Sequence, residues 1–157
     1  MIRRVEADDW ELLRDVRLRA LREDPDAFLS THAQESAFPE SVWQERARQA
    51  HGASFVAVED GAPEGLATGI AIDPASVMLV GMWVAPALRG SGAARELVTQ
   101  VVDWARSRQA ERVVLSVEGD NERAARLYER CGFSELDEMP NLPYEPNEGN
   151  RFFGLDL

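Results

Sequence analysis

The sequence predicts one α+β domain over residues 1–157. The length lies within the usual range for a domain with a single hydrophobic core. Apolar residues recur every three or four positions in the N-terminal third, which is typical of helices, and short β-branched runs bounded by turn residues follow, which are typical of strands. No internal repeat and no low-complexity tract interrupts this order.

Two helices are expected first. Asp8 or Asp9 can cap the first one, and Pro25 ends it. Its apolar residues fall near one face: Trp10, Leu13, Val16 and Ala20. The second helix begins near Pro39 and stops at Gly52. Its inward positions are Val42, Trp43, Ala47 and Ala50.

The middle of the chain changes to strand patterns. The runs SFVAV and LATGIAI flank the turn-rich EDGAPEG, which predicts a hairpin, and Asp73-Pro74 ends its second strand. A third strand, VMLVGMWV, leads into a glycine turn and then into a strongly periodic helix. The apolar stripe of that helix consists of Ala94, Leu97, Val98, Val101, Val102 and Ala105.

The last third predicts three strands around one helix. RVVLSV is an apolar, β-branched strand, and the segment GDNERAARLYERCGF forms a helix that Gly132 ends. One face of this helix carries Ala124, Leu127, Tyr128 and Cys131. A short strand around 133–136, a loop rich in proline and acid, and a final strand RFFGLDL follow. The final strand is expected to be exposed and able to pair with a second copy, which would form a homodimer.

Charge and composition restrict the partners. The formal net charge of -11 repels nucleic acid and anionic lipid, and makes a cationic partner electrostatically easier. No apolar run has the length of a signal peptide or of a membrane span, so we expect a soluble protein. The lone Cys131 fits a reducing cytoplasm and is expected to be a small buried hydrophobe.

The glycine turn in VAPALRGSGAARELV predicts an anion site. A helix that starts directly after such a turn presents unpaired N–H groups and a favourable dipole to a phosphate. A P-loop would need Lys-Ser or Lys-Thr after its last glycine, and here Gly92 is followed by two alanines. A dinucleotide fingerprint would need a small residue where Arg95 stands. A glycine pair of this kind can also serve only to shape a tight turn.

Two motifs resemble those of the GNAT superfamily of N-acetyltransferases. The glycine-turn stretch is similar to the family's Q/R-x-x-G-x-G/A pattern, which is met by Arg89, Gly92 and Ala94. The later stretch DNERAARLYERCGF is similar to its N-x-x-A-x-x-L-Y-x-x-x-G-F segment. The matching positions there are Asn121, Ala124, Leu127, Tyr128, Gly132 and Phe133. The expected helices and strands follow the family's order along the whole chain.

The resemblance implies a fold and a co-substrate. The fold is a mixed, mostly antiparallel sheet of about six to seven strands in three layers, flanked by helices and splayed between the fourth and fifth strands. Acetyl-CoA would lie in the cleft, with no metal. Its implied binding residues are Met82, Val84, Arg89, Gly90, Ser91, Gly92, Ala93, Ala94, Asn121 and Tyr128. Arg89 and Arg95 would offset the negative charge near the pyrophosphate.

Acetyl transfer to an amine needs a neutral amine, a donor for the oxyanion and a proton for the departing thiolate. The resemblance makes Tyr128 the catalytic acid, and the Val84 N–H is the expected oxyanion donor. Some relatives carry a glutamate where this chain has Ser116, so the general base is open. The other candidate carboxylates are Glu35, Asp73, Glu118 and Asp120. His32 lies where the family usually builds the acceptor site.

The expected function is therefore transfer of an acetyl group from acetyl-CoA to a primary amine of a small molecule or peptide. Two alternatives stay open: acyl transfer to a protein N-terminus or lysine, and an acyl-CoA-binding sensor without turnover. The acceptor depends on the shapes of the segments FLSTHAQESAFPE and MPNLPYEPNEGN, which carry no motif of their own.

Overall fold

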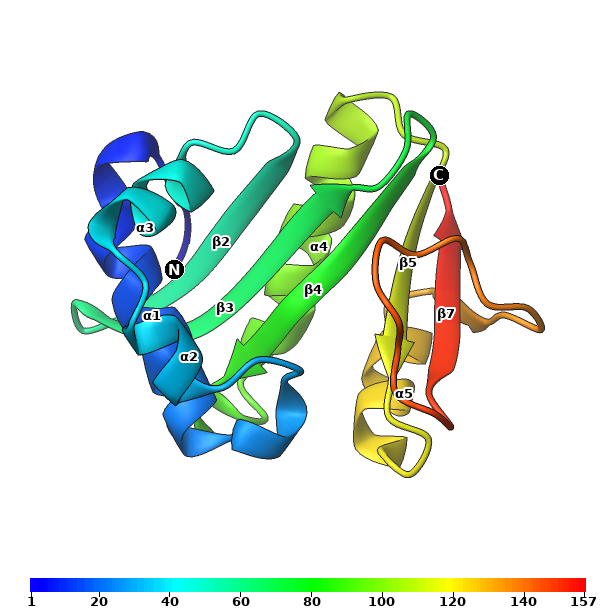
Figure 1. Cartoon of the computed structure of the whole chain (residues 1–157). Helices are drawn as coiled ribbons and strands as arrows, with labels where there is room; N and C mark the ends of the chain where they lie inside the picture. The colour runs from blue at the N-terminus through cyan, green and yellow to red at the C-terminus, as the bar shows by residue number, and fades with distance from the viewer.

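The computed structural model describes all residues 1–157 and is built around one seven-stranded sheet (Figure 1). The strands lie in the order β1-β2-β3-β4-β5-β7-β6, and only β4 and β5 run parallel. The strands are β1 (Ile2–Arg4), β2 (Gly52–Glu59), β3 (Ala62–Ala71), β4 (Ser76–Val84), β5 (Arg112–Val117), β6 (Ser134–Glu135) and β7 (Arg151–Asp156). This is the mostly antiparallel sheet that the sequence predicted.

Helices cover both faces of the sheet and make three layers. They are α1 (Trp10–Glu23), α2 (His32–Ser36), α3 (Glu40–Ala47), α4 (Ala93–Ser107) and α5 (Glu122–Arg130). Two neighbouring residues of β3 illustrate the two faces of the sheet, because successive side chains of a strand point to opposite faces. Leu66 packs in the cluster of α1, and Ala67 packs in the larger cluster of α4 and α5. None of the helices is both long and apolar enough to cross a membrane.

The sheet opens between β4 and β5. The two strands pair only from Ser76 to Met78, against residues 112–114 (Figure 1). Further along, β4 pairs only with β3, and β5 pairs only with β7. A register shift in the β3–β4 pairing and a positive φ of 64° at Gly81 mark a bulge, which bends β4 away from its neighbour. The predicted splay between the fourth and fifth strands is confirmed.

Several element predictions are confirmed at their boundaries. Asp9 is the N-cap residue of α1, although its side chain accepts the Glu6 N–H instead of capping the helix, and β5 covers the run RVVLSV. The α4 stripe is buried except for Ala94, whose place in the core is taken by Ala93. In α5, the buried residues are Ala125 and Tyr128, while Ala124, Leu127 and Cys131 lie half-buried at the edge of the core. The predicted inward face of α5 is therefore rotated by about one residue.

Other predictions are wrong. The second predicted helix, α3, ends at Ala47, and Ala50 is exposed before Gly52 opens β2. The short elements β1 and α2 were not predicted. The final strand β7 lies between β5 and β6, so it is not the exposed edge expected from the sequence. Because β6 pairs only with Phe153 and Gly154, it covers part of this strand, and a homodimer stays a prediction.

Candidate active site

A cavity of about 360 Å³ lies where β4 and β5 separate. Its walls come from β4, from the C-terminal end of β5 and from the first turns of α5. The two segments expected to shape the acceptor site also reach it, through Phe28 to Ser30 on one side and through Tyr144, Asn147 and Asn150 on the other. A cavity of this size suits a small molecule or the end of a larger one.

The free edge of β4 presents backbone groups to this opening. The Ala85 N–H donates to the Glu64 carbonyl at 2.7 Å, which makes these two residues a hydrogen-bonded pair. Along an antiparallel ladder, hydrogen-bonded pairs alternate with pairs that make no hydrogen bonds to each other. Val84 and Gly65 form the next pair, so the N–H and C=O of Val84 point away from β3. The Val84 carbonyl accepts a hydrogen bond from Arg89 Nε at 3.3 Å. The Val84 N–H is thus available at the edge, and Met82 lines the cavity.

The turn before α4 has unpaired backbone amides. Gly90 and Gly92 have φ of 82° and 91°, and a Cβ on either would meet nothing within 4 Å. The Ala93 N–H donates weakly to Ser91 Oγ at 3.3 Å. Four amides make no hydrogen bond within the protein: those of Gly90, Gly92, Ala94 and Arg95. The turn therefore leaves unpaired N–H groups at a helix N-terminus, and anion binding there stays a prediction.

The side chain of Arg89 has a partner that the sequence did not reveal. Its Nη2 donates to Asp24 Oδ2 at 3.1 Å, and the same oxygen accepts from Trp83 Nε1 at 2.6 Å. Asp24 directly follows α1, so this contact ties the glycine turn to the other side of the sheet. Arg89 therefore brings a neutralised charge to the turn, whereas the exposed Arg95 makes no ion pair.

Tyr128 is buried in α5 and lines the cavity. Its ring packs against Phe133 with centroids 6.0 Å apart, and its hydroxyl makes no hydrogen bond within the protein. Burial, with a smaller contribution from Cys131, raises the pKa of this hydroxyl above its usual value, so the proton stays on the phenol at neutral pH. The hydroxyl therefore keeps a proton at the cavity wall, and its role as the catalytic acid stays a prediction.

Two further predicted residues line the same cavity. Asn121 caps α5, because its side chain accepts the Ala124 N–H at 3.1 Å, and this leaves its amide nitrogen free. Ser116, where some relatives have glutamate, lies 3.5 Å from the hydroxyl of Tyr144. Tyr144 was not singled out from the sequence, because nothing in its proline-rich loop marks it as a site residue.

The candidate bases differ sharply in their surroundings. Glu35 is 1% exposed and accepts hydrogen bonds from Arg17 and Arg46. Burial alone would raise its pKa, but the two guanidinium groups outweigh burial and hold the pKa at about 2, so Glu35 cannot accept a proton at neutral pH. Glu118 is an exposed carboxylate at the cavity wall. The other candidates, His32, Asp73 and Asp120, do not line the cavity.

The remaining polar groups add no metal cluster. No three His, Cys, Asp or Glu side chains lie together as a metal ion would require. Cys131 at the C-terminal end of α5 packs against the core as expected, but it is half-buried rather than buried.

Comparisons with known proteins identify the family of this fold. The model of the acetyltransferase (GNAT) family matches residues 16–133, and the chain belongs to this family. An acetyltransferase from Streptococcus agalactiae superposes with a TM-score of 0.78 at 23% identity, over 100% of this chain and 98% of that one. YncA of Salmonella typhimurium, solved with its cofactor acetyl-CoA, superposes with a TM-score of 0.74 at 20% identity, over 99% and 92%.

One curated relative is similar over a shorter stretch. Mycothiol acetyltransferase of Beutenbergia cavernae is 40% identical over 64 residues. This stretch makes up 41% of the present chain and 22% of the relative. The chain thus matches about a fifth of the length of that protein, and the similarity supports the family rather than a particular acceptor.

Proposed function

We propose that residues 1–157 form one N-acetyltransferase domain that moves an acetyl group from acetyl-CoA directly to a primary amine. The observation that carries this proposal is the continuous path from the glycine turn along the free edge of β4 to a cavity lined by Tyr128. When bound, acetyl-CoA supplies the acetyl thioester. The donor-binding groups, the proton donor and the acceptor segments would then meet at one place.

The turn is proposed to hold the pyrophosphate. Its backbone from Arg89 to Ala94 includes three of the four unpaired amides, and the dipole of the 15-residue helix α4 favours an anion at this end. Because Gly90 and Gly92 carry no side chains, phosphate oxygens can approach the backbone closely. Ser91 and Ala93 belong to the same turn, and the exposed Arg95 adds a positive charge beside it.

The edge of β4 is proposed to bind the pantetheine arm through main-chain groups of Met82 and Val84. The bulge at Gly81 keeps this edge apart from β5, which leaves it unpaired. A backbone N–H that is fixed by the sheet needs no reorganisation to stabilise negative charge on the acetyl oxygen, and the Val84 N–H is placed for this role.

Tyr128 is proposed to protonate the departing thiolate. The transfer from a phenol of ordinary pKa to a thiol costs about 2 kcal/mol, and the raised pKa of Tyr128 adds to that cost. For an ordinary phenol this cost is a modest part of a catalysed barrier. Asn121 is proposed to contact the co-substrate through its free amide nitrogen. Glu118 is the only carboxylate at the cavity wall, so it is the one side chain proposed to take the proton of the amine, through a water molecule. The other proposed route is loss of this proton directly to solvent.

The acceptor is proposed to be a small-molecule or peptide amine. The net charge of -11 predicts attraction of a cationic amine, but the cavity wall itself carries one residue of each sign, Arg17 and Glu118. A cytoplasmic location stays a prediction from the single cysteine. A second candidate function is an acyl-CoA sensor without turnover. It is kept because Ser116 stands where some relatives have a glutamate.

The test is a paired measurement of free thiol and acetylated amine, with acetyl-CoA and a panel of primary amines. Direct transfer predicts one thiol released per amine acetylated, at a rate that depends on the amine. Tight binding of acetyl-CoA with no turnover for any amine would instead favour the sensor. Thiol release that does not depend on the amine would mean thioester hydrolysis and would contradict the proposal.

A further inference from the structure

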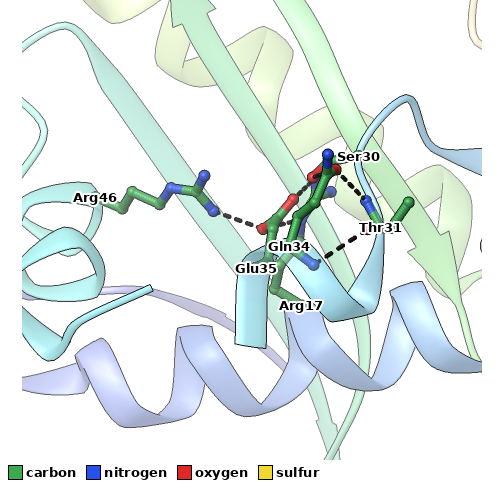
Figure 2. Close-up of polar contacts among 6 residues, drawn as sticks. All are labelled: Arg17, Ser30, Thr31, Gln34, Glu35 and Arg46. Carbon is green, nitrogen blue, oxygen red and sulfur yellow. Dashed lines mark hydrogen bonds and ion pairs between the residues drawn. The ribbon is translucent and has the colours of Figure 1, made fainter. Parts of the chain in front are cut away.

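Three helices on one side of the sheet meet at a buried carboxylate (Figure 2). Glu35 of α2 accepts two hydrogen bonds from Arg17 of α1, from Nε at 3.1 Å and from Nη2 at 2.9 Å. It accepts a third from Nη1 of Arg46 in α3, at 2.8 Å. Two guanidinium groups share one carboxylate, so this Arg17–Glu35–Arg46 cluster carries one uncompensated positive charge.

The cluster is locally positive and partly buried, although the net charge of the protein is -11. Glu35 stays ionised at neutral pH, so the surplus is one unit and not two. No other acidic side chain forms an ion pair with Arg17 or with Arg46. A partly buried positive charge without a counterion costs free energy, which a bound anion would recover.

Arg17 places this charge at the cavity. Its side chain lines the 360 Å³ cavity between β4 and β5, and also a neighbouring cavity of about 240 Å³ between the sheet and α1 and α3. Its Nη1 makes no hydrogen bond within the protein and would lie 3.4 Å from a Cβ on Gly81. Arg46 and the hydroxyls of Ser54 and Thr68 line the second cavity, which has no acidic side chain in its wall.

The guanidinium group of Arg17 is held in place before any ligand arrives. Glu35 fixes one edge of it through two hydrogen bonds, and the ring of Phe28 lies 4.8 Å from its central carbon. Phe28 itself lines the cavity. A fixed guanidinium edge with free N–H groups is suited to bind a carboxylate at little cost in side-chain entropy.

We infer that the amine acceptor carries a carboxylate, and that Arg17 binds this group at the cavity wall. The substrate class is an amino acid or a compound with a similar arrangement of amine and carboxylate. The single surplus charge matches a monoanion, and Glu118 in the same wall suits the ammonium form of the incoming amine. The inference rests on the proposed acetyl transfer and names its acceptor class.

The first test compares each of the twenty L-amino acids with its carboxamide, which keeps the amine and the side chain but lacks the negative charge. We expect kcat/KM for the accepted amino acids to exceed that for their amides by about tenfold to a hundredfold, the range for a hydrogen bond to a charged group. Equal use of acids and amides, or acetylation of other amines only, would overturn the inference.

The second test uses Arg17→Gln and Arg17→Lys, with Arg14→Gln as the matched control. Arg14 lies on the same helix and lines neither cavity. Arg17→Gln should remove the preference for the acid mainly through KM, and Arg17→Lys, which keeps the charge but loses the planar edge, should lower it partly. The control should keep the parent preference, and an Arg17→Gln variant that also keeps it would overturn the inference. Thermal unfolding checks that each variant folds.

A binding measurement separates the inference from the proposed function. If no amine is acetylated, the proposed function fails, and calorimetry with the same amino acids and amides in the presence of coenzyme A still tests the subsite. Binding of acids over amides that Arg17→Gln abolishes would support it. Equal or absent binding of both would overturn it.

Discussion

Gly92 offers the sharpest test of where the pyrophosphate binds. Its φ of 91° lies in the left-handed region, so alanine should cost about 1–2 kcal/mol of stability through backbone strain alone. For a chain of 157 residues this corresponds to a fall in Tm of about 2–8 °C. A Cβ there meets no protein atom within 4 Å, so the methyl group occupies the space that phosphate oxygens would use. We expect Gly92→Ala to raise the Kd for acetyl-CoA at least about tenfold, equivalent to one charge-assisted hydrogen bond.

The control is Gly61→Ala. Gly61 has φ of 79°, also has nothing within 4 Å, and lies in the turn between β2 and β3 rather than at the cleft. Both variants should lose similar stability in thermal unfolding, but only Gly92→Ala should bind acetyl-CoA more weakly in calorimetry. Equal affinity of the two folded variants and the parent would refute the placement of the pyrophosphate at this turn.

Three further predictions follow from the site and the core. Tyr128→Phe should lower the single-turnover rate of acetyl transfer about a hundredfold or more with little change in acetyl-CoA affinity, while Tyr144→Phe should lower it far less; equal rates would make Tyr128 a packing residue. Because the pKa of Glu35 is about 2 when folded and ordinarily 4.5, its stabilising contribution is complete above about pH 4.5 and is lost as the pH falls toward 2. The free energy of unfolding of the parent should therefore fall more over that range than that of Glu35→Gln, and parallel pH profiles would contradict this. Leu97→Ala, at a fully buried position of α4, should cost about 2–5 kcal/mol in denaturant unfolding, and a loss under 1 kcal/mol would mean that the core is packed differently.

Long periodic elements were predictable from the sequence because their patterns are local. The stripe of α4 and the β-branched run of β5 each repeat over enough residues to fix both type and position. The five-residue helix α2 is too short to show a period, although Thr31 and Gln34 form a capping box at its start. That box is the one local signal that would have predicted it.

The order of the strands in the sheet was harder to predict from the sequence. The insertion of β7 between β5 and β6 depends on pairings between residues far apart in sequence, and no local pattern records them. The family resemblance predicted the splay between β4 and β5. The bulge at Gly81, which bends the strand, is marked in sequence only by one glycine in an otherwise apolar run.

The candidate site also contains residues that the sequence predicted and residues that it did not. The glycine turn and Tyr128 lie in contiguous motifs, so they could be named from the sequence. The Arg17–Glu35–Arg46 cluster joins three helices, and the contact of Arg89 with Asp24 spans 65 positions, so neither follows from spacing. Glu35 was a candidate base on sequence grounds, and its partners instead make it a fixed anion.

The most direct test of the account is a crystal structure of the protein with coenzyme A. Pyrophosphate oxygens are expected within about 3.2 Å of the backbone amides of Gly90, Gly92 and Ala94. The pantetheine arm is expected along the free edge of β4, with the thiol in the cavity beside the Tyr128 hydroxyl. Coenzyme A bound on the α1–α3 side of the sheet, or bound with these amides facing only solvent, would contradict this placement.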